Sequence, residues 1–190
     1  MSDAIHIHED DWGMRSLHPI AAWADATADL QGSFEAAVNN RAPDGIGWTD
    51  IHLIETPTLD FTSTGLLLHL IANRLAPMMP RVPRFIATAM AGFDPSRRDP
   101  YGSYEDEAWA YGFSADCFIK LEPKDDLVAR IWFEARTGEE KKLAALRQAI
   151  DIIDSAAEAM IIDYWADAAG RVRDLSFAER YFAGLAGSEP

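Results

Sequence analysis

The stretch from Asp116 to Met160 limits the fold of this chain more than any other part of the sequence. Two apolar segments, Asp116–Glu122 and Leu127–Ala135, are joined by Pro123-Lys-Asp-Asp126, which has the composition of a tight turn. Apolar and polar residues alternate in part along the second segment, as they do in a strand with one buried face. The short connection therefore predicts an antiparallel β-hairpin.

A long helix is expected directly after this hairpin. Thr137-Gly-Glu-Glu140 matches a capping box, in which the Thr hydroxyl and the Glu140 carboxylate each accept a backbone N–H of the other residue. Apolar residues then recur at spacings of three and four, which puts them on one helical face. We expect that face to lie on a sheet and a parallel acidic stripe to face water. The apolar positions are Leu143, Leu146, Ile150, Ile153, Ala157 and Met160, and the acidic ones are Asp151, Asp154 and Glu158.

The rest of the chain predicts further strands and helices. Together with the hairpin and the long helix, they predict one α+β domain over residues 1–190. Its sheet should be mostly antiparallel, with a long C-terminal helix packed on one face. Strands are expected at 4–8, 48–54, 84–88, 109–113 and 161–165, a turn at 168–171, and helices at 19–40, 62–75 and 175–185.

Charge separates the possible partners of the chain into two groups. Its 17 basic and 31 acidic residues give a net charge of −14. Nucleic acid and anionic membrane surfaces both require basic protein surfaces, so the sequence argues against both. A basic protein partner is compatible with this charge, because opposite charges speed encounter. Solubility alone would also account for it.

The sequence favours a cytoplasmic location. The N-terminus lacks the basic region and apolar core of a secretory signal, and the longest apolar runs are shorter than a membrane span. A single cysteine, Cys117, excludes an intramolecular disulfide. Because Cys117 lies in a predicted strand, we interpret it as a small buried hydrophobic residue.

The densest cluster of chemically useful side chains is His6-Ile-His-Glu-Asp-Asp11. On a strand, His6 and His8 point to the same face, and a carboxylate such as Asp10 could complete a site for a divalent metal. None of the other three histidines lies in a recognisable ligand motif. A metal-dependent hydrolase or a small-ligand site built on this cluster is therefore the second hypothesis for the function, and an exposed strand end with a polar turn is the structural alternative.

The segment Leu59-Asp-Phe-Thr-Ser-Thr-Gly-Leu-Leu-Leu68 leads into a predicted helix for which Thr62, Ser63 or Thr64 can act as the N-cap. Over ten residues it is similar to the Ser-containing turn of STAS-domain anti-sigma antagonists, and that resemblance implies a phosphorylated Ser63. Phe61 stands where the turn of that family carries Asp, and the length of the chain and the hairpin differ from that small domain. We therefore interpret the segment as a helix cap.

The leading hypothesis for the function is a non-catalytic binding or inhibitory protein with a basic protein partner. The chain lacks the phosphate-binding, dinucleotide, nucleophile-elbow, zinc-protease and calcium motifs, and no cofactor is predicted. Bacterial toxin-neutralising immunity proteins are likewise small, acidic and of the α+β fold class. The oligomeric state is left open. Aromatic residues beside carboxylates are typical of binding surfaces, and the candidates are Glu9, Asp10 and Trp12 together with Glu105, Asp106, Glu107 and Trp109.

Overall fold

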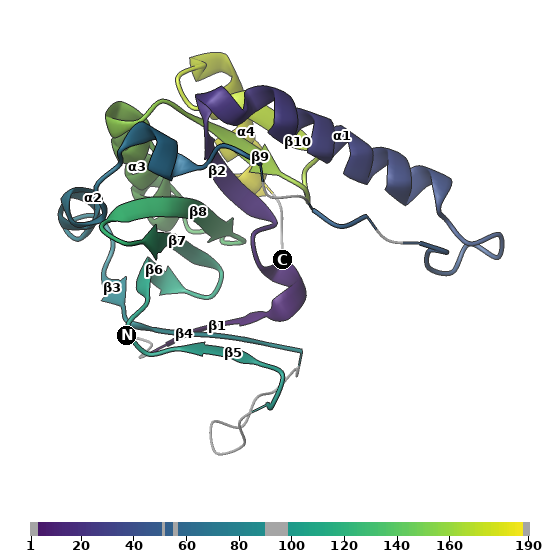
Figure 1. Cartoon of the computed structure of the whole chain (residues 1–190), viewed down its shortest axis with the longest axis horizontal. Coiled ribbons are helices and arrows are strands. Elements are labelled where there is room, and N and C mark those ends of the chain that lie inside the picture. The colour runs from purple at the N-terminus through teal and green to yellow at the C-terminus, as the bar shows by residue number, and fades with distance from the viewer. Residues whose placement is uncertain (1–3, 51, 55–56, 90–98, 188–190) are drawn as a thin grey trace.

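The structure is a computed structural model that describes residues 4–50, 52–54, 57–89 and 99–187 (Figure 1). It has an α+β fold with two sheets. The small sheet contains β1 (Ala4–His8), β4 (Arg84–Thr88) and β5 (Ser103–Glu105). The large sheet contains β2 (Arg15–Pro19), β3 (Arg81–Val82), β6 (Trp109–Ser114), β7 (Cys117–Lys124), β8 (Leu127–Ala135), β9 (Ala159–Asp163) and β10 (Ala168–Arg171).

The large sheet is antiparallel throughout, with the strand order β10-β9-β2-β8-β7-β6-β3. The small sheet has the order β1-β4-β5, and its β1–β4 pair is parallel. The helices are α1 (Trp23–Asn39), α2 (Leu68–Leu75), α3 (Glu140–Ala156) and α4 (Leu175–Gly187), and three short 3-10 helices are η1 (Glu9–Asp11), η2 (Ile20–Ala22) and η3 (Phe61–Thr64).

One face of the large sheet is covered by α2, α3 and α4. The predicted apolar face of the long helix is confirmed, since Leu146, Ile150 and Ile153 are fully buried among the side chains of the sheet. Burying a large aliphatic side chain stabilises a fold by about 1.5–3 kcal/mol, so this layer is the main hydrophobic core. Cys117 is also fully buried here, as interpreted from the sequence.

The opposite face of the large sheet has two separate covers. The small sheet packs on β6, β7 and β8 through an aromatic cluster that includes Phe85, Phe118 and Trp132. The first half of α1 packs on β9, where Leu30 meets Met160. Between the two covers lie β2 and part of β8, which none of the described helices covers on this side (Figure 1).

A buried ionic network joins the middle of the large sheet to α4. The Nε of Arg15 on β2 donates to Asp163 Oδ2 on β9 at 2.9 Å, and its Nη1 forms an ion pair with Glu134 on β8. The Tyr181 hydroxyl on α4 donates to the same Asp163 oxygen at 2.8 Å. Because Asp163 is fully buried, its charge depends on these partners rather than on water.

The predicted hairpin is confirmed as β7 and β8, and the predicted strands at 4–8, 84–88, 109–113 and 161–165 correspond to β1, β4, β6 and β9. The strand predicted at 48–54 is wrong, because Trp48 forms only an isolated bridge with Arg41; Ile51 lies outside the described residues. The turn predicted at 168–171 is β10. The sequence analysis missed β2, whose Arg-Ser-Leu-His-Pro sequence has little β-propensity and forms a strand only because it fills the slot between β8 and β9.

The capping box at Thr137 is wrong. The helix α3 begins at Glu140, its N-cap is Glu139, and the Thr137 hydroxyl accepts the N–H of Glu139 at 3.3 Å instead. The hydroxyl satisfies a donor just before the helix, so the chain turns slightly later than the pattern predicts. The difference of a few residues lies within the usual imprecision of helix boundaries.

The acidic stripe on α3 is not uniformly solvated. Asp154 is buried, and it accepts the N–H of Ala159 and the Nε of Arg173, both at 2.8 Å. The helix ends at Ala156, so Met160 belongs to β9 and packs against α1 rather than extending the helical face. Asp154 therefore holds the sharp reversal from the helix into the strand.

The segment at Leu59–Leu68 contains a short 3-10 helix and the first residue of a separate α-helix. The N-cap of η3 is Asp60, whose carboxylate accepts the N–H of Thr62 at 2.9 Å, and α2 begins only at Leu68. Thr62, Ser63 and Thr64 therefore lie inside η3 and none of them caps α2. The cap seats Phe61, which is fully buried, in the main core.

Replacing Asp163 by Ala tests the buried network. The substitution leaves the Arg15 guanidinium with one partner fewer in a buried site, so we expect a loss of about 3–5 kcal/mol in the free energy of unfolding. Urea denaturation measures this loss. The control is Asp151→Ala on the exposed side of α3, which should change the free energy by no more than about 0.5 kcal/mol. Equal losses in the two variants would contradict a special role for the network.

Candidate functional site

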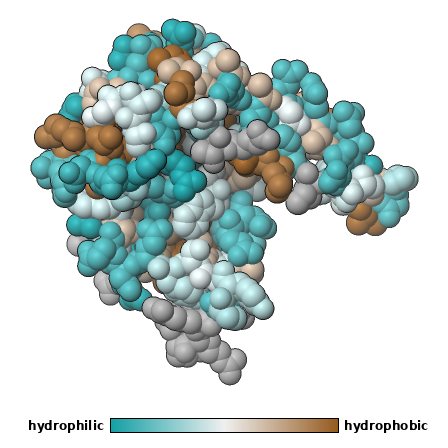
Figure 2. All heavy atoms as spheres, in the orientation of Figure 1, coloured by the Kyte–Doolittle hydropathy of each residue, from teal (hydrophilic) through white to brown (hydrophobic). Residues whose placement is uncertain are grey.

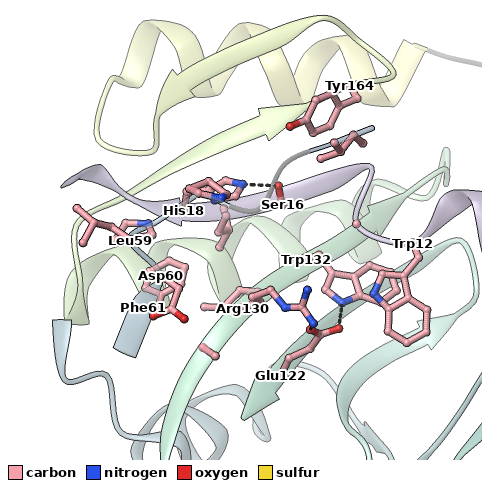
Figure 3. A pocket seen from close by; sticks show the side chains of 17 residues that line it. Trp12, Ser16, His18, Leu59, Asp60, Phe61, Glu122, Arg130, Trp132 and Tyr164 are labelled. Atoms are coloured by element: carbon pink, nitrogen blue, oxygen red, sulfur yellow. Dashed lines mark hydrogen bonds and ion pairs between the residues drawn. The ribbon is translucent and has the colours of Figure 1, made fainter. Parts of the chain in front are cut away.

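A pocket of about 210 Å³ lies on the large sheet in the gap between α1 and the small sheet (Figure 3). Its floor is formed by β2 and β8, the two strands that none of the described helices covers on this side. Ile54, Pro57 and Leu59, which lie between α1 and η3 in the chain, form one wall, and Trp12 forms part of another. The pocket therefore exists because the two covers of this face do not meet.

Ser16 and His18 form the polar part of the floor. They are two residues apart on β2, so both side chains point to the same face of the sheet. Ser16 Oγ lies 2.8 Å from His18 Nε2, and Figure 3 marks this contact with a dashed line. Burial lowers the pKa of His18 to about 4, although the Asp29 carboxylate acts in the opposite direction. The imidazole is therefore neutral at neutral pH.

A neutralised charge pair lies across the pocket from His18. Arg130 and Glu122 face each other in the β7–β8 register, and their Nη2 and Oε2 atoms are 2.6 Å apart. The other Glu122 oxygen accepts the indole N–H of Trp132 at 3.0 Å (Figure 3). The Glu122 carboxylate is buried but fully engaged, so the pocket presents no unpaired charge at this point.

The remaining lining is largely apolar. Ile54 and Leu59 come from the residues between α1 and η3, and Trp132 comes from β8. Leu17, Ile131 and Phe61 also border the pocket, but their side chains are buried in the main core. Ile54 and Leu59 are 43% and 40% exposed, so the rim of the pocket is apolar as well as its interior. A largely apolar cavity with a few placed polar groups is the usual form of a small-molecule site.

A second exposed feature begins next to this rim. We call residues 31–54 the arm; it consists of the second half of α1 and the chain that returns along it (Figure 1). None of the arm residues that the structure describes is buried. Large apolar side chains are exposed on it, and Figure 2 shows hydrophobic residues at its tip and its base. The exposed large apolar residues of the arm are Phe34, Val38, Ile46, Trp48, Leu53 and Ile54.

The arm is nevertheless ordered by specific contacts. The Trp48 indole N–H donates to the carbonyl of Ala37 at 2.9 Å, and the N–H of Thr49 donates to Asn40 at 2.7 Å. His52 packs over Gly32, where a Cβ atom would lie only 3.3 Å from the imidazole. Gly32 therefore lies inside α1 and leaves room for the returning chain.

The first group of predicted contact residues, Glu9, Asp10 and Trp12, directly follows β1 of the small sheet. Glu9 and Asp10 are exposed in η1, whereas the Trp12 ring stacks on Trp132 with a centroid distance of 5.3 Å. Trp12 also meets Phe85 edge-on at 5.5 Å. Trp12 thus packs in the aromatic cluster and lines the pocket, while the two carboxylates beside it remain accessible.

Most residues of the second predicted contact group form ion pairs within the chain. Glu105 lies 2.9 Å from Nζ of the buried Lys120, and Asp106 and Glu107 have looser ion pairs with Arg84 at 3.7 Å and Arg81 at 3.8 Å. Trp109 is half-buried and lies beneath the Arg81 guanidinium, 4.3 Å from its ring centroid. The charge at this edge of the molecule is therefore largely balanced within the chain.

The histidines of the predicted metal cluster also have protein partners. His6 Nε2 lies 2.8 Å from the Thr88 hydroxyl, and His8 Nδ1 accepts the N–H of Asp10 at 3.3 Å. Burial lowers the pKa of His6. Among the described residues, no three His, Cys, Asp or Glu side chains come together in a way that could hold a metal ion.

Comparison of the chain with protein-family models, curated proteins and solved structures gives no match. Within the part of the chain that the structure describes, no helix has the length and apolar character needed to cross a membrane. The function therefore has to be argued from the geometry of the pocket and the arm. Neither Ser16 and His18 nor the arm was predicted as a site, because the sequence of β2 has little β-propensity and gives no local sign of a strand.

The pKa of His18 predicts a pH dependence of stability. Unfolded His18 binds a proton below about pH 6.5 and folded His18 only below about pH 4, so the unfolded state holds more protons in between. Stability attributable to His18 is therefore present above pH 6.5 and is lost as the pH falls towards 4. Urea denaturation of His18→Gln should show a fall across this range that is smaller by roughly 1–3 kcal/mol than in the unmodified protein. His8→Gln, at an exposed histidine, should retain the full fall.

Proposed function

We propose that the protein is a non-catalytic, cytoplasmic binding protein that docks on a basic protein partner through the arm. The observation that carries this proposal is the set of large apolar side chains exposed on an ordered projection whose described residues are all at least partly exposed. Clustered exposed apolar side chains on an ordered element are typical of interaction sites. On α1, Phe34 and Val38 lie four residues apart on one helical face, which suits insertion into a groove of a partner.

Charge supports a basic partner. The whole chain has a net charge of −14, and the arm carries Glu35, Asp44 and Asp50 against a single arginine, Arg41. Carboxylates around an apolar contact steer a basic protein towards it and increase the association rate. Glu9 and Asp10 are exposed and remain candidates for additional contacts. Glu105, Asp106 and Glu107 are weaker candidates than the arm because their charges are balanced within the chain.

The Ser16–His18 pair does not favour a hydrolase. A serine nucleophile needs a base whose pKa is close to the working pH. With its pKa lowered to about 4 by burial, the His18 imidazole accepts a proton too weakly to activate Ser16 near neutral pH. The metal-dependent alternative has no supporting ligand group among the described residues. These two points are the reasons for proposing binding rather than catalysis.

Affinity capture with matched variants tests the proposed function. The arm variant is Phe34→Ser/Val38→Ser. The control is Leu70→Ser/Leu175→Ser, which also replaces two exposed apolar residues, 60% and 68% exposed, away from the arm. From a lysate of the source organism, the unmodified and control proteins should retain a basic protein that the arm variant loses at least about tenfold, because 1.4 kcal/mol of lost contact is sufficient for that factor. Retention should fall as salt rises.

Identical retention by all three proteins would contradict docking through the arm. An arm-dependent partner that is acidic, or whose retention does not respond to salt, would contradict the electrostatic part of the proposal.

The arm variant should fold normally, and this is a separate prediction. Phe34 and Val38 are 54% and 60% exposed, so their replacement by Ser removes little buried surface. We expect the free energy of unfolding to change by no more than about 0.5 kcal/mol per residue. Urea denaturation of the purified variant measures it, and a larger loss would mean that these side chains support the fold rather than a partner.

A further inference from the structure

We infer that the pocket above Ser16 and His18 binds a small single-ring molecule that has no negative charge and carries a hydrogen-bond acceptor, such as an aromatic carboxamide. This inference is independent of the proposed docking through the arm. It rests on the size of the pocket, its balance of charge, one hydrogen-bond donor left available to a ligand, and the walls around that donor.

Size limits the ligand to one ring with a short substituent. The pocket holds about 210 Å³. Typical sites for drug-sized ligands hold about 300–1,000 Å³, whereas an apolar cavity of about 150 Å³ accommodates benzene. A benzene ring with a carboxamide therefore fits the available volume, and a nucleotide or a two-ring cofactor does not.

The charges that line the pocket disfavour an anionic ligand. Arg130 is the one guanidinium that lines the pocket, and Glu122 neutralises it at 2.6 Å. A ligand carboxylate would have to compete with Glu122 for Arg130 and would lie close to a buried carboxylate. Asp60 is a second carboxylate in the lining, and its Oδ1 accepts the N–H of Thr62 at 2.9 Å. A ligand carboxylate would therefore lose hydration without gaining an unpaired counter-charge.

The hydrogen bonds at His18 specify an acceptor on the ligand. We take the Ser16 hydroxyl as the donor to His18 Nε2, 2.8 Å away, which is one of the two tautomers that this contact allows. The neutral imidazole then carries its proton on Nδ1, for which no described residue provides a partner. Every fully buried side-chain nitrogen or oxygen of the described residues has a partner, so Nδ1 has access to solvent or to the pocket. A ligand carbonyl could accept this N–H.

The apolar walls would hold the ring. Ile54, Pro57 and Leu59 lie on one side of the pocket, and Trp12 lies on another. Trp132 lines the pocket opposite, and its indole N–H is already bound to Glu122, so it contributes an apolar surface rather than a donor. A ring bound on the floor of the pocket would place the carbonyl of its substituent towards His18. Figure 3 shows how the labelled side chains surround that position.

Titration with benzamide tests the inference. The readout is the indole N–H resonances of ¹⁵N-labelled protein, one of which belongs to Trp132. Benzamide should shift the Trp132 resonance to saturation. Benzoate, which adds a charge, and toluene, which lacks the acceptor, should each bind at least about tenfold more weakly, because each loses about 1.4 kcal/mol or more.

Two variants locate the binding. Ala129 lines the pocket and is only partly buried, so Ala129→Leu should fill the space and abolish the shift. The matched control is Ala156→Leu, at an exposed alanine at the end of α3, and it should leave the affinity unchanged. His18→Phe keeps an aromatic ring but removes the donor, and it should weaken benzamide at least tenfold while leaving toluene unaffected. The fold of each variant is checked by thermal melting.

Three results would overturn the inference: no saturable shift with benzamide, a shift that persists in Ala129→Leu, or equal affinities for benzamide and toluene. None of these bears on the arm, because the capture experiment uses variants outside the pocket. Loss of benzamide binding in Ala129→Leu, together with the weakening in His18→Phe, would support the site even if the arm has no partner.

Discussion

The fold depends on one buried guanidinium. Arg15 stands on the short strand β2, and it ties together β8 through Glu134, β9 through Asp163, and α4 through the Tyr181 hydroxyl on the same carboxylate. Burial raises the pKa of Glu134, and the charge of Arg15 opposes that rise. Desolvating such a cluster is costly, so the pairing contributes less to net stability than its contacts suggest. Its clearer effect is on register: if β2 slipped by one residue, Arg15 would move to the other face of the sheet and both carboxylates would be left unpaired.

The position of β2 also explains where a ligand can reach the sheet. On one side, α2, α3 and α4 form a continuous layer. On the other side, the small sheet and the first half of α1 bury different strands and leave β2 and part of β8 between them. The pocket occupies this gap, and the arm extends beyond it because α1 runs on after Leu30, its last buried residue. The pocket and the arm therefore follow from the same incomplete cover.

Local signals predicted much of the fold. The β7–β8 hairpin and the apolar face of α3 depend on turn chemistry and periodicity, which neighbouring residues decide. Boundaries were less predictable, because Thr137 and Asp154 both satisfy backbone groups in turns that the helical pattern does not reveal. The candidate contact residues illustrate a further limit. Glu105 seemed available from the sequence, but Lys120, which comes from a strand on another sheet, lies against it.

The sequence by itself determined the α+β class, the acidic character and the elements whose amphipathic pattern is strong. These properties depend on composition and on spacing along the chain, which folding does not change. Only the tertiary structure decided that Arg-Ser-Leu-His-Pro is a central strand, that Ser16 and His18 meet Arg130 and Glu122 across a pocket, and that the second half of α1 is left uncovered. Each of these features depends on which distant segments pack together, and no local pattern encodes that choice.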